Sequence, residues 1–128
     1  MDALFRRHER LIKTDFKPEK RYRAGKNEWA HIHRAFKGAK CRVCGTVPYE
    51  SLHHIYPRGQ GGDDVLVNLA PCCGSGTTGC HGLLEAHDPQ ARARLRANLT
   101  DGNRWYLTWK LGHGAGAWLD SQYPELAT

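Results

Sequence analysis

The chain has 128 residues, a length that fits one compact domain or a small core with appendages. Hydrophobic residues make up 40% of it, so we expect a modest core that needs reinforcement. No apolar run approaches the roughly 20 residues of a membrane span, and the first ten residues lack the apolar stretch of a secretion signal. These features argue against a membrane or secreted protein and predict a soluble, cytoplasmic one.

The positive charge of the chain gathers near its N-terminus. Residues 1–26 hold nine Lys and Arg against four Asp and Glu, which accounts for +5 of the formal net charge of +6. A basic arm on a nearly neutral body predicts a polyanionic partner such as DNA, whereas a solvated tail without a partner is the alternative. The side chains expected to contact DNA are Arg6, Arg7, Arg10, Lys20, Arg21 and Arg23.

The first third of the chain shows two helical patterns. Apolar residues at helical spacing predict a helix over 3–13, and the polar segment 14–25 reads as an irregular arm. A second helix is predicted from Asn27, its N-cap, to Phe36, and Gly38 ends it.

The middle of the chain alternates short extended pieces with turns. A tight turn is predicted at Cys41–Gly45, followed by strand character over 50–56. The Gly- and Asp-rich run 57–64 predicts a loop, and Val65–Leu69 a second extended piece.

The last third predicts two helices and a less regular tail. The run GSGTTG at 74–79 spells the dinucleotide-binding pattern, but it lies between two cysteines with no room for a βαβ unit, so it predicts a loop. A helix is expected over 80–86, and another over 90–97 after Asp88-Pro89, with aspartate as its N-cap. Residues 105–119 predict a loose hairpin or arm. The expected divisions are a basic helix or arm at 1–26, a core at 27–97 and a C-terminal extension at 98–128 that packs on the core or extends from it.

The cysteine spacing predicts a structural zinc site. In a reducing compartment, spaced cysteine pairs bind metal more often than they form disulfides. Cys41-x2-Cys44 is a turn that can aim two sulfurs at one point of a tetrahedron, and a wider pair ends at Cys80. Adjacency lets only one of Cys72 and Cys73 face the same metal. Free buried thiols or a redox pair are the alternative.

Several histidines are placed for metal-dependent hydrolysis. His53 and His54 are adjacent in an extended segment, so their side chains point to opposite faces and can reach one substrate only if the strand is bent or twisted, as the loop at 57–64 that follows would allow. His81 and Glu85, four residues apart on one helical face, suit shared metal coordination, whereas His87 reaches the same ion only if the helix ends or kinks. Neutral imidazoles at His53 and His81 can ligate an ion, and the unligated His54 can serve as a general base for water.

The residues with chemistry fall in four short motifs, CRVCG at 41–45, LHHIYPRGQGG at 52–62, NL at 68–69 and CHGLLEAH at 80–87. Together they resemble the HNH endonuclease family. The spelling CGSGTTGCHG looks like the variant found in HNH proteins of actinobacterial phages, which implies a phage origin. The resemblance implies a small α+β fold: a ββα-metal finger, two antiparallel strands and a helix around one divalent ion, with a four-cysteine zinc site and flanking helices.

The resemblance also implies residue roles. His53 and His81 look like ligands of the catalytic ion, and His54 looks like the general base. Asn68 looks like the residue that pins the loop and orients the base, and Arg58 is similar to the loop arginine that contacts a phosphate.

The metal ligands follow the family pattern with two departures. The spacing Asn-Leu-x3-Cys selects Cys73 over Cys72, but the last cysteine pair is four residues wider than usual. The third ligand of the catalytic ion stays open between Glu85 and His87, because some members carry a histidine where Glu85 stands. The zinc ligands implied are Cys41, Cys44, Cys73 and Cys80.

The resemblance implies a metal-dependent DNA endonuclease that hydrolyses phosphodiester bonds. Zinc would be its structural ion, and Mg²⁺, Mn²⁺ or another divalent ion its catalytic cofactor. A phage-encoded enzyme of this kind would act in the host cytoplasm. The alternative is a non-catalytic, zinc-braced DNA-binding or packaging accessory protein that acts with the large subunit of a phage terminase.

Overall fold

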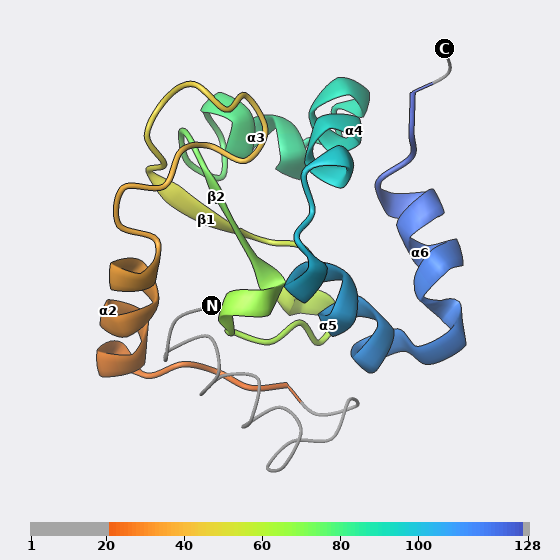
Figure 1. The fold of residues 1–128 in the computed structure, drawn as a ribbon, viewed down its shortest axis with the longest axis horizontal. Helices are drawn as coiled ribbons and strands as arrows, with labels where there is room; N and C mark the ends of the chain where they lie inside the picture. The colour runs from red at the N-terminus through yellow and green to blue at the C-terminus, as the bar shows by residue number, and fades with distance from the viewer. Residues whose placement is uncertain (1–20, 127–128) are drawn as a thin grey trace.

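A computed structural model describes residues 21–126 of the chain (Figure 1). The helix expected over 3–13 lies outside the described residues, as do the side chains of Arg6, Arg7, Arg10 and Lys20. Within the described range, no helix is long and apolar enough to cross a membrane.

Two short strands and the helix after them form the centre of the molecule. Strand β1 (Ser51–His54) pairs antiparallel with β2 (Leu69–Cys72), with His53 opposite Ala70. Helix α3 (Gly79–Glu85) follows β2 directly. This order confirms the small α+β architecture with two antiparallel strands and a helix.

Helix α2 (Lys26–Ala35) lies on one side of the strands (Figure 1). Its N-cap is Gly25 rather than the expected Asn27, and it ends at Phe36 as predicted. Its buried residue Ile32 packs with Leu66 and Leu69 in a small apolar cluster.

The loop between the strands contains two 3₁₀ turns, Arg58–Gln60 and Leu66–Asn68. The second turn replaces the extended piece expected over 65–69, and the strand begins only at Leu69. The cause is the buried Asn68, whose backbone N–H donates to the Val65 carbonyl at 2.9 Å. The chain therefore turns before it can pair.

Three helices complete the chain on the other side of the strands (Figure 1). Helix α4 (Pro89–Ala97) begins as predicted, since the Asp88 carboxylate accepts from the Ala91 N–H at 2.9 Å. Helices α5 (Asp101–Leu111) and α6 (Ala115–Gln122) replace the loose hairpin or arm expected over 105–119, so that prediction is wrong.

The core explains why the C-terminal segment is helical. The side chains of Tyr106 and Tyr123 are fully buried in the main apolar cluster, together with Leu107 and Leu119. A capping box at Thr100 starts α5.

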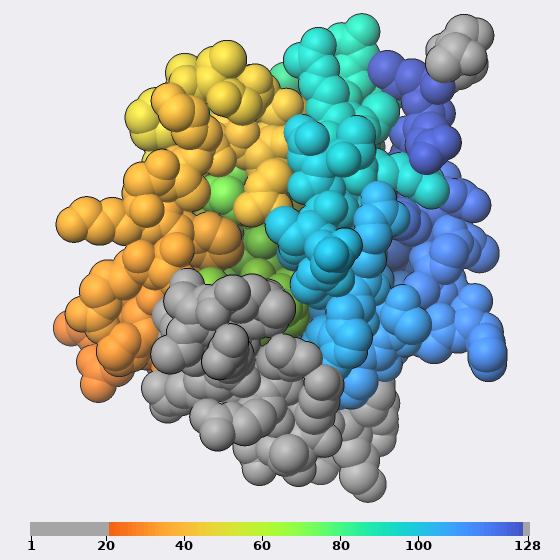
Figure 2. All heavy atoms as spheres, viewed as in Figure 1, coloured from red at the N-terminus to blue at the C-terminus, as the bar shows by residue number. Residues whose placement is uncertain are grey.

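The visible face of the molecule is hollowed between the segment around residues 35–42 and the start of α5, over a cavity of about 360 Å³ (Figure 2).

Candidate metal centres

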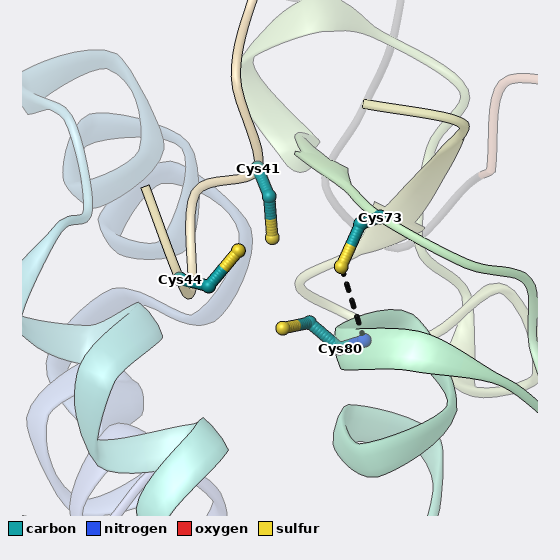
Figure 3. A group of neighbouring side chains, drawn as sticks. All are labelled: Cys41, Cys44, Cys73 and Cys80. Carbon is teal, nitrogen blue, oxygen red and sulfur yellow. Dashed lines mark hydrogen bonds between the residues drawn. The ribbon is translucent and has the colours of Figure 1, made fainter. Parts of the chain in front are cut away.

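Four cysteine sulfurs converge between the turn before β1 and the start of α3 (Figure 3). Cys41 and Cys44 come from that turn, Cys73 directly follows β2, and Cys80 lies in the first turn of α3. Their sulfur atoms all lie within 4.8 Å of one another. Zinc–sulfur bonds of about 2.3 Å place tetrahedral sulfurs roughly 3.8 Å apart, so the four side chains could hold one metal ion such as zinc.

Local hydrogen bonds favour the thiolate of Cys44, whereas the pKa values of Cys73 and Cys80 are raised. The N–H and hydroxyl of Thr46 donate to the Cys44 sulfur and lower the pKa of that thiol to about 6. The Cys80 N–H donates to the Cys73 sulfur at 3.4 Å (Figure 3). Burial and the neighbouring Cys73 raise the pKa of Cys80, so a cation at the centre would be needed to keep this thiol ionised.

The fifth cysteine lies outside the cluster. Cys72 is fully buried, its thiol donates to the Ala70 carbonyl at 3.5 Å, and burial raises its pKa to about 12. Of the adjacent pair, the structure therefore brings Cys73 and not Cys72 to the other sulfurs.

The wide spacing of the second cysteine pair is absorbed by a compact turn. Ser75 and Thr78 exchange backbone hydrogen bonds of 3.1 and 3.2 Å, which returns Cys80 towards Cys73. Gly74 sits at a φ of +80°, where a Cβ would lie 2.1 Å from the Thr78 carbonyl oxygen, so only glycine fits. This turn is the GSGTTG run, and it opens no βαβ unit.

A second group joins β1 to α3. The Glu85 Oε1 atom lies 3.0 Å from Nδ1 of His53 and 3.3 Å from Nε2 of His81. One ligand atom from each residue lies within 4.8 Å of the other two. Metal bonds of 2.0–2.1 Å make the edge of a tetrahedron roughly 3.3 Å, so the three residues fit one divalent ion. The structure thus brings His53, His81 and Glu85 together.

His87 lies outside this group. Helix α3 ends at Glu85, and His87 follows at a φ of +60°, exposed to solvent. Of the two candidates for a third ligand, the structure places Glu85 beside the histidines.

The ionisation of the group suits metal binding. Contact with His53 lowers the pKa of the Glu85 carboxyl to about 2. Burial lowers the pKa of His53, against the opposing effect of the Glu85 charge. A neutral imidazole and an ionised carboxylate are the forms that ligate a metal.

His54 points to the other face of β1, as predicted from strand alternation. Its Nε2 atom lies 2.8 Å from Oδ1 of the fully buried Asp64, and its ring meets Trp29 edge-on at 6.1 Å. Burial lowers the pKa of His54, while Asp64 raises it. In the neutral imidazole Nε2–H donates to Asp64, which leaves Nδ1 able to accept a proton.

Asp64 also gathers two arginines. Arg58, whose side chain is 53% exposed, lies 3.1 Å from the Asp64 carboxylate, so its guanidinium stands at the surface beside His54. Arg23 lies 3.5 Å from the same carboxylate and donates to the carbonyls of Gly62 and Arg58. Arg23, expected to contact DNA, therefore holds the loop in place, whereas Arg21 is exposed.

Asn68 pins the loop, as the sequence predicts. Its amide oxygen accepts from the Tyr56 N–H at 2.8 Å, and its amide nitrogen donates to the carbonyls of Tyr56 and Asp63 at 3.0 Å. The orientation of His54 comes from Asp64 rather than from Asn68.

Sequence reasoning missed several residues around the histidines and in the loop between the strands, among them Asp64. Asp63 is buried, accepts from the Tyr106 hydroxyl and pairs with Lys110 at 3.0 Å. Ser51 and Tyr123 contact the two histidines of the second group. The paired aspartates after the double glycine were the only local signal, because the other partners come from elements far along the chain.

Comparison of the chain with protein-family models, with curated proteins and with solved structures finds no match.

Proposed function

We propose that this protein is a metal-dependent DNA endonuclease of the HNH type. The observation that carries the proposal is the meeting of His53, His81 and Glu85 on a strand–strand–helix unit, with His54 at the next position of β1, held by the buried Asp64. Two imidazoles suit a transition-metal ion such as Zn²⁺ or Ni²⁺, the carboxylate also allows Mn²⁺ or Mg²⁺, and the four cysteines suit zinc.

The chain's own groups divide the work of hydrolysis. A divalent ion, when bound, polarises the phosphate and neutralises charge on the leaving oxygen. Neutral His54, held by Asp64 through Nε2–H, accepts a proton from water at Nδ1. The exposed guanidinium of Arg58 stands beside it as a cation for a phosphate oxygen.

The surface of α2 supports a nucleic-acid partner. Trp29 of this helix contacts His54, so a duplex bound along α2 would pass close to the base. Glu28 is the only acidic side chain between residues 26 and 40. The exposed basic residues and histidines of this stretch are Lys26, His31, His33, Arg34, Lys37 and Lys40. Such a surface attracts phosphates without reading base sequence.

A plasmid-nicking assay tests the proposal. Supercoiled plasmid is incubated with the protein and Mg²⁺ or Mn²⁺, beside His54→Ala and the control His113→Ala, an exposed histidine of the 3₁₀ turn Gly112–Gly114. We expect His54→Ala to nick roughly 100 to 10,000 times more slowly, the usual contribution of a general base, and the control to match the wild type. Equal nicking by both variants, or none by the wild type with either ion, contradicts the proposal.

The basic surface of α2 also favours a second candidate function. DNA binding by this surface does not need the metal-site histidines His53 and His81 or the base His54. On this reading the protein is a phage-encoded, non-catalytic accessory that binds DNA and acts with the terminase large subunit in the host cytoplasm. Retention of DNA in a gel-shift assay without nicking by any ion would select it. Loss of that retention in Arg34→Glu would place the contact on α2.

A further inference from the structure

The metal-facing nitrogen of His53 is set by a residue from the C-terminal end of the chain. The His53 Nε2 atom lies 2.7 Å from the Tyr123 hydroxyl, which in turn donates to the Ile55 carbonyl at 2.9 Å. A phenol carries one proton and a carbonyl can only accept, so the hydroxyl proton belongs to Ile55. The Tyr123 oxygen then accepts from His53 Nε2–H, which leaves Nδ1 unprotonated towards Glu85.

The same logic applies to His81 from another direction. Its Nδ1 atom lies 2.6 Å from the Ser51 hydroxyl, which donates to the Gly74 carbonyl at 2.7 Å. The serine proton is committed to the carbonyl, so the serine oxygen accepts from His81 Nδ1–H. The lone pair of Nε2 therefore faces Glu85 at 3.3 Å.

The two chains of hydrogen bonds aim three acceptors at one point. Two imidazole lone pairs and a carboxylate oxygen at 3.0 and 3.3 Å satisfy one another only when a metal ion, or an added proton on one imidazole, lies between them. We propose that Tyr123 and Ser51 are positioning residues that fix the tautomers of His53 and His81, so that the C-terminal segment completes the metal site. This inference rests on the metal site of the proposed function.

The packing holds Tyr123 in place for this role. Its side chain is 1% exposed, and the Arg92 guanidinium stacks 4.5 Å from its ring centre. Arg92 also donates to the carbonyls of Leu84 in α3 and Gln122 in α6. Tyr123 is thus tied to the helix that carries His81 and Glu85, and its hydroxyl has little freedom to rotate away.

The first experiment removes single hydroxyl groups and measures binding of Zn²⁺ by calorimetry, without DNA. The first equivalent fills the cysteine cluster, and the second reports on the histidine group. We expect Tyr123→Phe and Ser51→Ala each to weaken the second equivalent by roughly 10 to 100-fold, the usual cost of losing a group that orients a ligand. Ser51→Thr keeps the hydroxyl and should restore affinity.

The matched control is Tyr106→Phe, which also removes a buried tyrosine hydroxyl but one bonded to Asp63. It should leave the second equivalent unchanged. Wild-type affinity in both Tyr123→Phe and Ser51→Ala, or equal losses in Tyr106→Phe, would overturn the inference.

The second experiment needs no variant and guards against a misfolded one. Imidazole ¹⁵N NMR of the Zn²⁺-loaded wild type, at a pH well above the ordinary imidazole pKa of about 6.5, should show Nε2–H for His53 and Nδ1–H for His81. The opposite tautomers, or no second binding event, would overturn the inference. A protein with the expected tautomers that fails to cut DNA would refute the nuclease and keep the inference.

Discussion

Asp64 shows how one buried carboxylate organises the base side of the candidate active site. It is fully buried, yet it lies in contact with His54 and Arg58 and accepts from the Ala24 N–H at 3.0 Å. A buried charge is tolerated when several donors surround it, and each of these donors is fixed in return. His54 is therefore oriented by a charge partner as well as by the strand that carries it.

This contact leads to a prediction for the pH dependence of nicking. Burial lowers the pKa of His54 below its ordinary value near 6.5, against the opposing effect of Asp64. His54 therefore stays neutral to lower pH. The acid limb of the pH profile, where the nicking rate falls to half of its maximum, should lie below about pH 6.5. Asp64→Asn removes a group that raises the pKa, so it should move the limb lower still while slowing the reaction. A limb above the ordinary value, or one that rises in Asp64→Asn, would contradict this account.

A second prediction concerns the third metal ligand. Glu85 lies 3.0 and 3.3 Å from two imidazole nitrogens, whereas His87 lies beyond the helix end. We expect Glu85→Ala to weaken binding of the second Zn²⁺ equivalent by at least about tenfold, the lower bound for groups that merely orient ligands. His87→Ala should bind like the wild type. Titration calorimetry measures both, and an unchanged Glu85→Ala would remove this residue from the site.

Some of these side-chain contacts could be predicted from the sequence, and others could not. The pairing of His81 with Glu85 was predictable because four residues on a helix fix a common face. The bond of His53 to Tyr123 joins residues 70 positions apart and depends on where α6 docks. No local pattern encodes such a contact.

The helices of the C-terminal extension illustrate a different failure. The glycines around His113 suggested an irregular arm, yet they form only a short 3₁₀ turn between α5 and α6. The capping box at Thr100 and the burial of Tyr106 and Leu107 decide in favour of helix. At Asp88 the N-cap aspartate is followed directly by a proline at the first helical position, and from this pattern the sequence predicted the helix start correctly.

An ion pair between α5 and the loop that joins the strands leads to a prediction about stability. Lys110 of α5 and Asp63 of the loop form an ion pair whose side chains are 5% and 1% exposed. Lys110→Met leaves the Asp63 carboxylate buried beside the Tyr22 N–H and the Tyr106 hydroxyl, which are both neutral. Breaking a buried pair in this way costs about 3–5 kcal/mol. Urea unfolding should show this loss. The control Lys37→Met, at an exposed lysine, should leave the free energy of unfolding nearly unchanged.

The described part of the molecule is organised around one small unit that carries both candidate metal centres. Cys80 and His81 are neighbours in the first turn of α3, one facing the sulfur cluster and the other the histidine group. Cys73 and Ser51 likewise lie at or beside the paired ends of β2 and β1. The position of α3 against the strands therefore sets the geometry of both groups at once.

Removal of the zinc should accordingly disturb the whole unit. The turns that carry the four cysteines contribute few buried apolar side chains, and in such small cores the free energy of metal binding becomes free energy of folding. Cys44→Ser removes a ligand at a partly exposed position, whereas Cys72→Ala removes a buried thiol outside the cluster. Elemental analysis should find at least one zinc ion fewer in Cys44→Ser than in the wild type and Cys72→Ala.

The same two variants separate lost packing from lost metal. Cys72→Ala leaves a small cavity and should lower the thermal midpoint modestly. Cys44→Ser should lower it further, and a strong chelator should lower the midpoint of the wild type and Cys72→Ala but not that of Cys44→Ser. Because His81 follows Cys80 directly, Cys44→Ser should also weaken the binding of a metal ion by His53, His81 and Glu85. An unchanged zinc content in Cys44→Ser would exclude a four-cysteine site, and intact binding at the histidines would show that the two centres fold independently.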